Sequence, residues 1–461
     1  MATIKSRKPS SPPQRPPTVL GLPVIDPDTA GIDIGATALS AAVGPDRDPQ
    51  PVRTFGTFTT DLQALADWLR ACRVQRVALE ATGVYWIPVF QFLAAAGLEV
   101  CVVNPRHVRH VRGRKSDVSD AQWLQHLHAV GLLQPSFRPE DAICALRTLF
   151  RPREGLIAQA AQQVQLMQKA LDQMNLHLHH VLSDLVGVSG QRILAAILAG
   201  ERDARTLAKL RERGCQADEE TVIAALTGDW RSEHLFTLRQ AYATFAHFQE
   251  LVRGGDAEIE TWLQQHPAPG PEPPTPPAPP KPSGGRNAVQ LPTLDLRAEL
   301  HRRFGVDVTA IPSLGVSTAC ALFTELGTDL SAFGTAARFC SWLGLCPNPK
   351  KSNQRVLQSG TRKIKHRVAA LFRQAAQTTH RSEHHLGVFY RRMRAKLGAP
   401  QAVTATAHKL ARIFYHVVTQ KEPYDASIYE QKDEVTEQRR LTRLKREAKS
   451  MGFDLQPLVV S

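Results

Sequence analysis

Short apolar runs alternate with longer amphipathic segments in the first third of the chain. The short runs predict β-strands, and segments with apolar residues every three or four positions predict α-helices. The expected strands lie at 30–35, 38–43, 52–58, 76–81 and 98–103, and the expected helices lie near 60–72, 85–96 and 117–130. These elements predict an α/β domain over residues 28–140.

The order of the elements favours one kind of α/β domain. Three strands come first, followed by a helix, a strand, a helix and a strand. This order is typical of an RNase H-like arrangement, and it fits a simple doubly wound sheet less well.

A helical region is expected over residues 141–265. Its first part has apolar residues spaced alternately by threes and fours: Ile157, Ala160, Val164, Met167, Leu171, Met174, Leu178, Val181 and Leu185. Four such heptads predict a coiled coil, but an amphipathic helix packed within its own domain explains the spacing equally well. A seam between two chains would make the protein at least a dimer.

Two proline-rich segments divide the remainder of the chain. Residues 1–27 combine prolines with Lys and Arg and predict a disordered basic arm, whereas 266–289 predict a stiff, extended linker. The linker leads into a mainly α-helical domain over 290–424, and a charged helical tail occupies 425–461.

Composition points to a polyanionic partner. The 461 residues carry a formal net charge of +14, and Arg, Lys and His are dense between Arg355 and Arg412. A ribosome, a membrane surface or a nucleic acid would all fit such a charge. The seven cysteines show no Cys-x-x-Cys spacing, so we expect reduced core thiols of a cytoplasmic protein rather than zinc ligands. No apolar run is long enough to span a bilayer, and the polar N-terminus does not resemble a signal peptide, so no membrane partner is expected.

Four acidic residues are the candidate catalytic and metal-binding groups: Asp33, Glu80, Asp117 and Asp120. The first two lie at the ends of predicted strands, and the other two are three positions apart at the start of a predicted helix. Clustered carboxylates need cations, and hard oxygen ligands suit Mg²⁺, with Mn²⁺ possible. A helix N-cap with an acid in the first turn is the commoner explanation of the last pair taken alone. The four together favour a metal site for phosphoryl transfer, which tilts the choice of partner towards nucleic acid.

The second domain contains a turn-and-helix motif, Ile311-Pro-Ser-Leu-Gly-Val-Ser-Thr-Ala319. It resembles a helix-hairpin-helix element, in which backbone N–H groups near Gly315 would face a phosphate without reading sequence. An ordinary helical hairpin is the alternative.

A basic loop follows this motif. Ser352 lies between Lys350, Lys351 and Arg355, and its hydroxyl would need activation to act as a nucleophile. An ordinary loop serine is the commoner explanation, and Ser359 is equally placed. Further candidate nucleic-acid contacts, besides these three basic residues and Gly315, are Lys115, Arg362, Lys363, Lys365, Arg391, Arg392 and Lys409.

The four acids and their surroundings resemble the DEDD-type transposases of the insertion sequence 110 family, whose relatives include the Piv DNA invertase. The motifs that carry this resemblance are Glu80-Ala-Thr-Gly-Val-Tyr-Trp-Ile-Pro88, Val103-Asn-Pro-Arg-His107, Gly113-Arg-Lys-Ser-Asp-Val-Ser-Asp-Ala121, Gln168-Lys-Ala-Leu-Asp-Gln-Met-Asn175 and Ala405-Thr-Ala-His-Lys-Leu-Ala-Arg412.

The resemblance implies a site-specific DNA recombinase of a mobile element. It implies an RNase H-like (RuvC-like) domain whose four acids bind Mg²⁺, a coiled coil, and a second domain whose serine attacks DNA and holds it covalently. It also implies DNA ends and target DNA as partners, a structured guide (bridge) RNA, a dimer or tetramer, and action at the nucleoid in a prokaryotic cytoplasm.

The matching serine is Ser352, which the family motif places after Leu343-Gly-Leu-Cys-Pro347. Asn353 follows it where glycine is usual, which leaves Ser359-Gly360 as a rival. Ser313 also stands where glycine is usual.

Three other functions are weighed against this expectation. A RuvC-like nuclease would use water and form no covalent intermediate. Gly31-Ile-Asp-Ile-Gly-Ala-Thr37 resembles the phosphate loop of actin-like sugar kinases, but the second phosphate motif is missing. A non-catalytic RNA- or DNA-binding protein would need only the basic charge.

Overall fold

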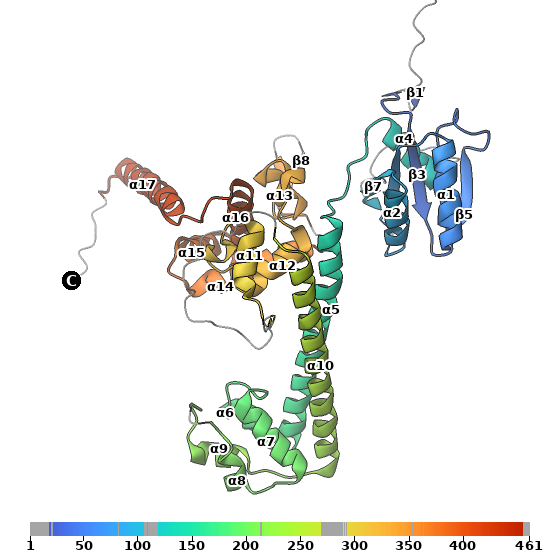
Figure 1. The fold of residues 1–461 in the computed structure, drawn as a ribbon. Helices are drawn as coiled ribbons and strands as arrows, with labels where there is room; N and C mark the ends of the chain where they lie inside the picture. The colour runs from blue at the N-terminus through green and yellow to red at the C-terminus, as the bar shows by residue number, and fades with distance from the viewer. Residues whose placement is uncertain are drawn as a thin grey trace, which may run out of the picture. The chain divides into compact units, whose positions relative to one another are not determined.

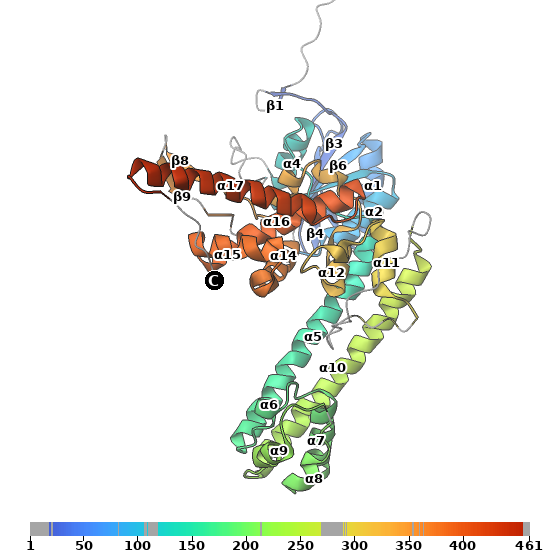
Figure 2. The ribbon, with the colours of Figure 1, turned by 90° about the vertical axis from the view of Figure 1, so that its left-hand side faces the viewer.

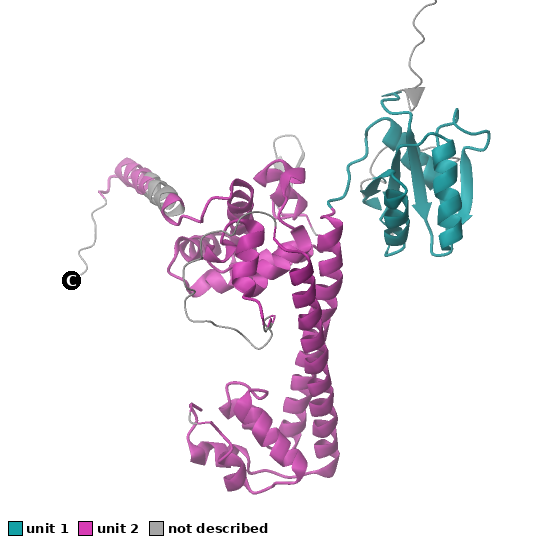
Figure 3. Ribbon diagram, viewed as in Figure 1, with its two compact units in different colours: residues 1–137 teal, residues 138–461 magenta. Residues whose placement is uncertain are grey.

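The computed structural model describes residues 18–19, 22–81, 83–105, 108, 119–212, 214–268, 289, 291, 293–352, 355–358, 360–362 and 364–454. The chain forms two compact units, 1–137 and 138–461, which we describe separately (Figure 3).

The first unit is built on a mixed five-stranded sheet. Its strands are β3 (Thr29–Ile34), β4 (Ala38–Ala42), β5 (Val52–Gly56), β6 (Arg76–Glu80) and β7 (Glu99–Val103), in the order β5-β4-β3-β6-β7. The first three pair antiparallel, whereas β6 is parallel to β3 and β7 is parallel to β6. The topology is consistent with an RNase H-like domain, and each expected strand is present within two residues of its expected start and end.

Helices cover both faces of this sheet (Figure 1). Helices α1 (Thr59–Ala71) and α2 (Trp86–Ala95) pack on one face around an apolar core that includes Ile32, Leu65 and Leu79. Helix α4 (Asp120–Ala129) packs against β3 on the opposite face.

The expected disordered arm is partly structured. Two short strands, β1 (Thr18–Val19) and β2 (Leu22–Pro23), pair antiparallel, and the Ile25 N–H donates to the Ala129 carbonyl at 2.9 Å. Residues 1–17 and 20–21 lie outside the described residues.

The second unit is mainly helical and begins with α5 (Asp141–Gln173), which runs antiparallel to α10 (Ser232–Gln265) (Figures 1 and 2). Four short helices connect them: α6 (Leu178–Val181), α7 (Val188–Ala199), α8 (Ala204–Ala208) and α9 (Glu219–Ala225). They pack with the end of α5 and the start of α10 around one apolar core.

The heptad residues face this intramolecular core. Ala160, Met167, Leu171, Met174, Leu178 and Leu185 are all buried in it, together with Leu238 and Phe245 of α10. Helix α5 ends at Gln173, so the last part of the heptad pattern belongs to the following turn and to α6. The apolar spacing therefore reflects packing within the chain.

The remaining elements gather at the other end of the helix pair. The helices are α11 (Leu296–Phe304), α12 (Val316–Leu326), α13 (Ala336–Trp342), α14 (Arg367–Thr378), α15 (His385–Leu397), α16 (Ala399–Gln420) and α17 (Ser427–Ser450). Three 3-10 turns, η1 (Val308–Ala310), η2 (Ser331–Phe333) and η3 (Thr379–Arg381), and the strand pair β8 (Lys350–Ser352) and β9 (Arg355–Gln358) lie between them.

A buried glutamate joins α12 to α5 and α14. Glu325 of α12 is 6% exposed. Its carboxylate accepts two hydrogen bonds from Arg151 of α5, at 2.9 and 2.8 Å, and forms an ion pair with Arg367 of α14 at 3.0 Å. Arg147 donates to the carbonyls of Thr324 and Glu325. Helices on both sides of the expected linker are thus packed together; most of the linker itself, 269–288, lies outside the described residues.

Candidate functional site

Strand register places Asp33 and Glu80 next to each other at the C-terminal ends of β3 and β6. Ile32 of β3 pairs with Leu79 of β6 in parallel register, so the next position on each strand is occupied by an acid. Ile32 and Leu79 are fully buried beneath α1 and α2. Because successive side chains of a strand point to opposite faces, Asp33 and Glu80 lie on the face covered by α4. Both side chains are half-buried.

Gly31 determines how closely α4 approaches this face. A Cβ at Gly31 would overlap the backbone nitrogen of Gln125 and the carbonyl oxygen of Ala121. The other end of the helix is fixed by His128, whose Nδ1 lies 3.4 Å from the Ala30 carbonyl oxygen. The helix therefore runs antiparallel to β3, with its N-terminus at the end of the strand that carries Asp33.

Asp120 is the first residue of α4, but the helix is capped by its neighbour. The Ser119 hydroxyl accepts from the Gln122 N–H at 3.2 Å, and the Gln122 side-chain oxygen accepts from the Ser119 N–H at 3.1 Å. This reciprocal pair is a capping box. The N-cap of α4 is therefore Ser119 and not Asp117, whereas Asp120 lies in the first turn as expected, where the helix dipole favours an acid. Asp117 and Lys115 lie outside the described residues.

The chemistry of these strand ends fits a divalent cation. Asp33 and Glu80 stand at the ends of β3 and β6, and Asp120 is the first residue of α4, which packs on the same face; the carboxylate oxygens of these three described residues do not all lie within 4.8 Å of one another. Carboxylate oxygens are the donors that Mg²⁺ and Mn²⁺ prefer. The N-terminus of α4 favours the ionised form of carboxylates near it.

Sequence reasoning missed two residues of this arrangement. Gly31 lies two positions before Asp33, so a side chain at that position would point to the same face of the sheet, where only glycine leaves room for a crossing helix. Ser119 begins a Ser-x-x-Gln pattern, which is a sequence signature of a capping box. Both signals are present in the sequence.

Ser352 is the last residue of β8 and pairs with Arg355 of β9. The two strands form a hairpin with Asn353 and Gln354 between them, and these two residues lie outside the described part of the chain, as do Ser359 and Lys363. The hairpin thus aligns the backbone of the candidate nucleophile with that of one candidate phosphate contact. Lys350 and Lys351 belong to the same hairpin.

The motif at 311–315 forms a tight turn before α12. The Leu314 N–H donates to the Ile311 carbonyl at 3.1 Å, and Ser313 adopts a left-handed conformation with φ of 70°. Gly315 is the exposed N-cap residue of α12. The left-handed conformation explains why glycine is usual where this chain has Ser313.

The other candidate basic contacts have different surroundings. Arg362 and Arg391 bind protein groups: Arg362 donates to the Ser341 hydroxyl at 3.2 Å, and Arg391 donates to the carbonyls of His380 and Ser382 at 3.2 and 2.7 Å. Lys365 is exposed. Arg392 and Lys409 lie 5.5 and 4.8 Å from the ring centre of Phe389 and form a cationic cluster between α15 and α16.

Two family models match the chain. Residues 30–176 match a DEDD-type model of the IS110 family described as transposase, and residues 307–391 match one described as transposase of the IS116/IS110/IS902 family. The first range contains all four candidate acids, and the second contains Gly315 and Ser352. The two matches, with which the fold agrees, therefore define a DNA transposase.

The two models together cover just over half of the chain, which belongs to the IS110 family of transposases. The resemblance seen in the sequence is thus confirmed. No individual curated protein matches the chain. Within the described residues, no helix is both long and apolar enough to cross a membrane.

Proposed function

We propose that this transposase cuts and rejoins DNA with a metal centre formed by Asp33, Glu80, Asp117 and Asp120 and with Ser352 as nucleophile. The observation that supports the metal centre is the register of β3 and β6, which sets two acids side by side beneath the N-terminus of α4. A pair of Mg²⁺ ions bound there would polarise the scissile phosphate and neutralise charge that develops on it.

Each described residue has a definite task in this proposal. Asp33 and Glu80 hold their carboxylates at fixed positions because each is anchored in a central strand. Asp120 is held by the capped first turn of α4, and Gly31 keeps that helix against the sheet. Preorganisation of this kind avoids rearranging the donors during the reaction.

The covalent step is a transesterification at phosphorus. The Ser352 Oγ forms a bond to phosphorus while the bond from phosphorus to one deoxyribose oxygen breaks. The serine proton is transferred to the released deoxyribose oxygen, which becomes a hydroxyl group. Attack by a hydroxyl of a second DNA strand then releases the serine and restores a phosphodiester, so no energy-rich co-substrate is consumed.

The cationic residues of the second unit would hold the DNA. Lys350, Lys351, Arg355 and Lys365 are near the proposed nucleophile in sequence, and the Arg392–Lys409 cluster adds a further phosphate site. The Gly315 turn offers backbone N–H groups of α12. Because Arg362 and Arg391 already bind protein groups, we assign them to folding rather than to DNA.

A guide RNA and a second subunit complete the proposal. Target choice by RNA pairing would need only a sequence-independent basic surface on the protein, which the charge of +14 supplies. A dimer or tetramer would let the acids of one subunit act with the serine of another. Mixtures of Asp33→Asn and Ser352→Ala subunits should then regain activity, and mixtures that remain inactive in every assembly would contradict this arrangement.

The decisive experiment is a search for a denaturant-resistant protein–DNA adduct. The protein, its co-purifying RNA and junction DNA of the element are incubated with Mg²⁺, in parallel with Ser352→Ala, Ser359→Ala and Asp33→Asn. We expect the adduct in the wild type and in Ser359→Ala only. Loss in Ser359→Ala alone would move the nucleophile, and cleavage without any adduct would identify a RuvC-like nuclease that uses water.

A further inference from the structure

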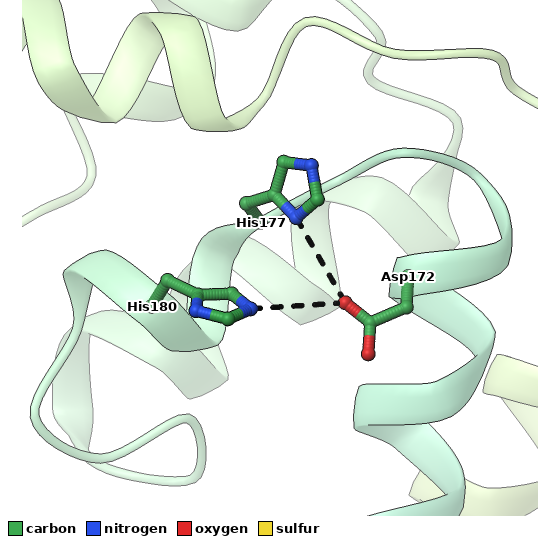
Figure 4. Close-up of side chains that lie close together, drawn as sticks. All are labelled: Asp172, His177 and His180. Atoms are coloured by element: carbon green, nitrogen blue, oxygen red, sulfur yellow. Dashed lines mark ion pairs between the residues drawn. The ribbon is translucent and has the colours of Figure 1, made fainter.

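Two histidines, His177 and His180, face Asp172 at the turn between α5 and α6, far along the chain from the four acids (Figure 4), and His179 lies close by. The Oδ1 of Asp172 lies 3.9 Å from Nδ1 of His177, 3.5 Å from Nε2 of His179 and 4.0 Å from Nε2 of His180. In Figure 4 the rings of His177 and His180 both turn toward the Asp172 carboxylate. Asp172, His177 and His180 are exposed, so an ion can reach them from solvent.

These separations fit a shared ion better than direct bonds. A charge-assisted hydrogen bond from imidazole to carboxylate is about 2.7–2.9 Å long, and all three distances exceed it. Ligands at about 2.0–2.1 Å from a tetrahedral Zn²⁺ lie about 3.3 Å from one another. The ligand atoms of Asp172, His177 and His180 all lie within 4.8 Å of one another, so side-chain movements of about 1 Å would bring these three donors to one ion.

The tautomer of His177 strengthens this argument. Its Nε2 lies 3.0 Å from the side-chain oxygen of Asn175, an acceptor that suits a proton on Nε2. The neutral ring with that proton would present the Nδ1 lone pair towards Asp172, ready to bind a cation placed between them. A second residue that orients a ligating histidine in this way is usual in metal sites.

The local backbone also brings the histidines together. The rings of His179 and His180 lie with their centres 4.3 Å apart, tilted by 46°. Asn175 has a left-handed backbone with φ of 55°, which folds the chain back so that α6 follows α5 directly. The turn thus gathers donors from both helices at one point.

We propose that Asp172, His177 and His180 bind one borderline divalent transition-metal ion, foremost Zn²⁺, at a site separate from the DEDD acids. Imidazole and carboxylate donors suit Zn²⁺, Ni²⁺ or Co²⁺, whereas Mg²⁺ prefers an all-oxygen shell. The ion would fasten the end of α5 to the start of α6. It stabilises that turn and takes no part in strand transfer.

The test measures Zn²⁺ binding to the full-length protein in excess Mg²⁺, which occupies oxygen-rich sites. Competition with a chromophoric chelator gives the affinity, and Co²⁺ replacement gives a visible spectrum that reports nitrogen ligands. We expect one ion per chain. Asp172→Asn and His177→Asn should each weaken binding by at least about tenfold, and the double change His177→Asn with His180→Asn should abolish it.

His247→Asn is the matched control, because His247 is an exposed histidine on α10 of the same unit. It should bind Zn²⁺ as the wild type does. Zn²⁺ should also raise the melting temperature of the wild type and of His247→Asn but not of Asp172→Asn, which separates binding from misfolding. Equal Zn²⁺ affinity in all variants, or no binding to the wild type, would overturn the proposal.

Discussion

The carboxylates of the first unit and the buried Glu325 of the second unit are held in place in different ways. In the first unit, Asp33 and Glu80 are aligned by strand register at the ends of β3 and β6, where they are half-buried. In the second unit, Glu325 is buried between helices and bound by Arg151 and Arg367. The difference agrees with the proposal that Asp33 and Glu80 serve chemistry, whereas Glu325 serves folding. Substitutions should therefore separate the two.

The largest expected effect is on activity, from Asp33→Asn. The change removes a proposed metal ligand and should lower recombination by roughly a thousandfold, while the free energy of unfolding should change by less than about 1 kcal/mol because clustered like charge is relieved. Product formation on junction DNA and urea unfolding measure the two effects. Asp67→Asn, on the exposed side of α1, is the control and should keep full activity. Wild-type activity in Asp33→Asn would remove Asp33 from the site.

The converse result is expected for Glu325→Ala. The change removes the buried carboxylate that binds Arg151 and Arg367, although Arg367 keeps its pair with Glu154. Breaking a buried ion pair typically costs about 3–5 kcal/mol of stability. Glu250→Ala is the matched control: its pair with Arg253 is about 70% exposed, and exposed pairs contribute about 0–1 kcal/mol. Urea unfolding compares the two. Similar losses in both variants would show that burial does not distinguish them.

Gly31→Ala tests the approach of α4 to the sheet. The new methyl group would overlap backbone atoms of α4, so we expect a loss of about 1–3 kcal/mol, typical of overpacking, together with reduced activity as Asp120 is displaced. Gly155→Ala is the control, because nothing lies near its Cβ in the middle of α5. It should stabilise by up to about 1 kcal/mol. Gly31→Ala with wild-type stability would mean that α4 is not in contact there.

A smaller effect is expected on the pH dependence of the free energy of unfolding of the second unit. Burial lowers the pKa of His366 to about 4, whereas the unfolded imidazole titrates near 6.5. The unfolded state therefore binds the proton first, so the free energy of unfolding falls as pH drops from about 6.5 to 4. We expect this residue to account for about 1 kcal/mol after allowance for solvent screening.

His366→Asn isolates this contribution. His366 caps α14 by accepting from the Ala369 N–H at 3.5 Å, and asparagine can keep such a cap without titrating. Urea unfolding at pH 6.5 and 4.5 should show a smaller loss in the variant. An unchanged pH dependence would exclude His366 as its source.

Ser313→Gly should produce the smallest change. A non-glycine residue in the left-handed region costs about 1 kcal/mol or more, and the greater freedom of glycine in the unfolded chain offsets part of that gain. We expect a net stabilisation of about 0.5 kcal/mol in thermal unfolding. Destabilisation would show that the Ser313 side chain contributes a contact that outweighs the strain.

Local patterns in the sequence predicted the first unit well. Each strand is a short apolar run, so the five strands were located within two residues, and the order of elements implied the mixed sheet. The acids at strand ends could be recognised for the same reason. The Ser-x-x-Gln pattern at Ser119 signals the N-cap of α4, whereas the cap expected from the acids was Asp117.

Long-range pairing could not be read in this way. The spacing from Ile157 to Leu185 showed that a helix had an apolar face, but nothing in it specified α10 as the partner. The contact between Arg151 and Glu325 joins residues 174 positions apart, and no local pattern marks either of them. The turn that gathers Asp172 and three histidines depends on the end of α5 at Gln173, which the uninterrupted heptad pattern did not indicate.

The antiparallel pairing of α5 and α10 has an evolutionary consequence. Both helices cross about 50 Å at 1.5 Å per residue and return the chain to where it started, so residues 174–231 form an excursion with its entrance and exit side by side. Such a segment can be lengthened, shortened or exchanged between elements without altering the Glu325 contacts at the base. The helix pair thus gives a mobile element a replaceable module, in which new binding properties can arise while the catalytic parts stay under separate selection.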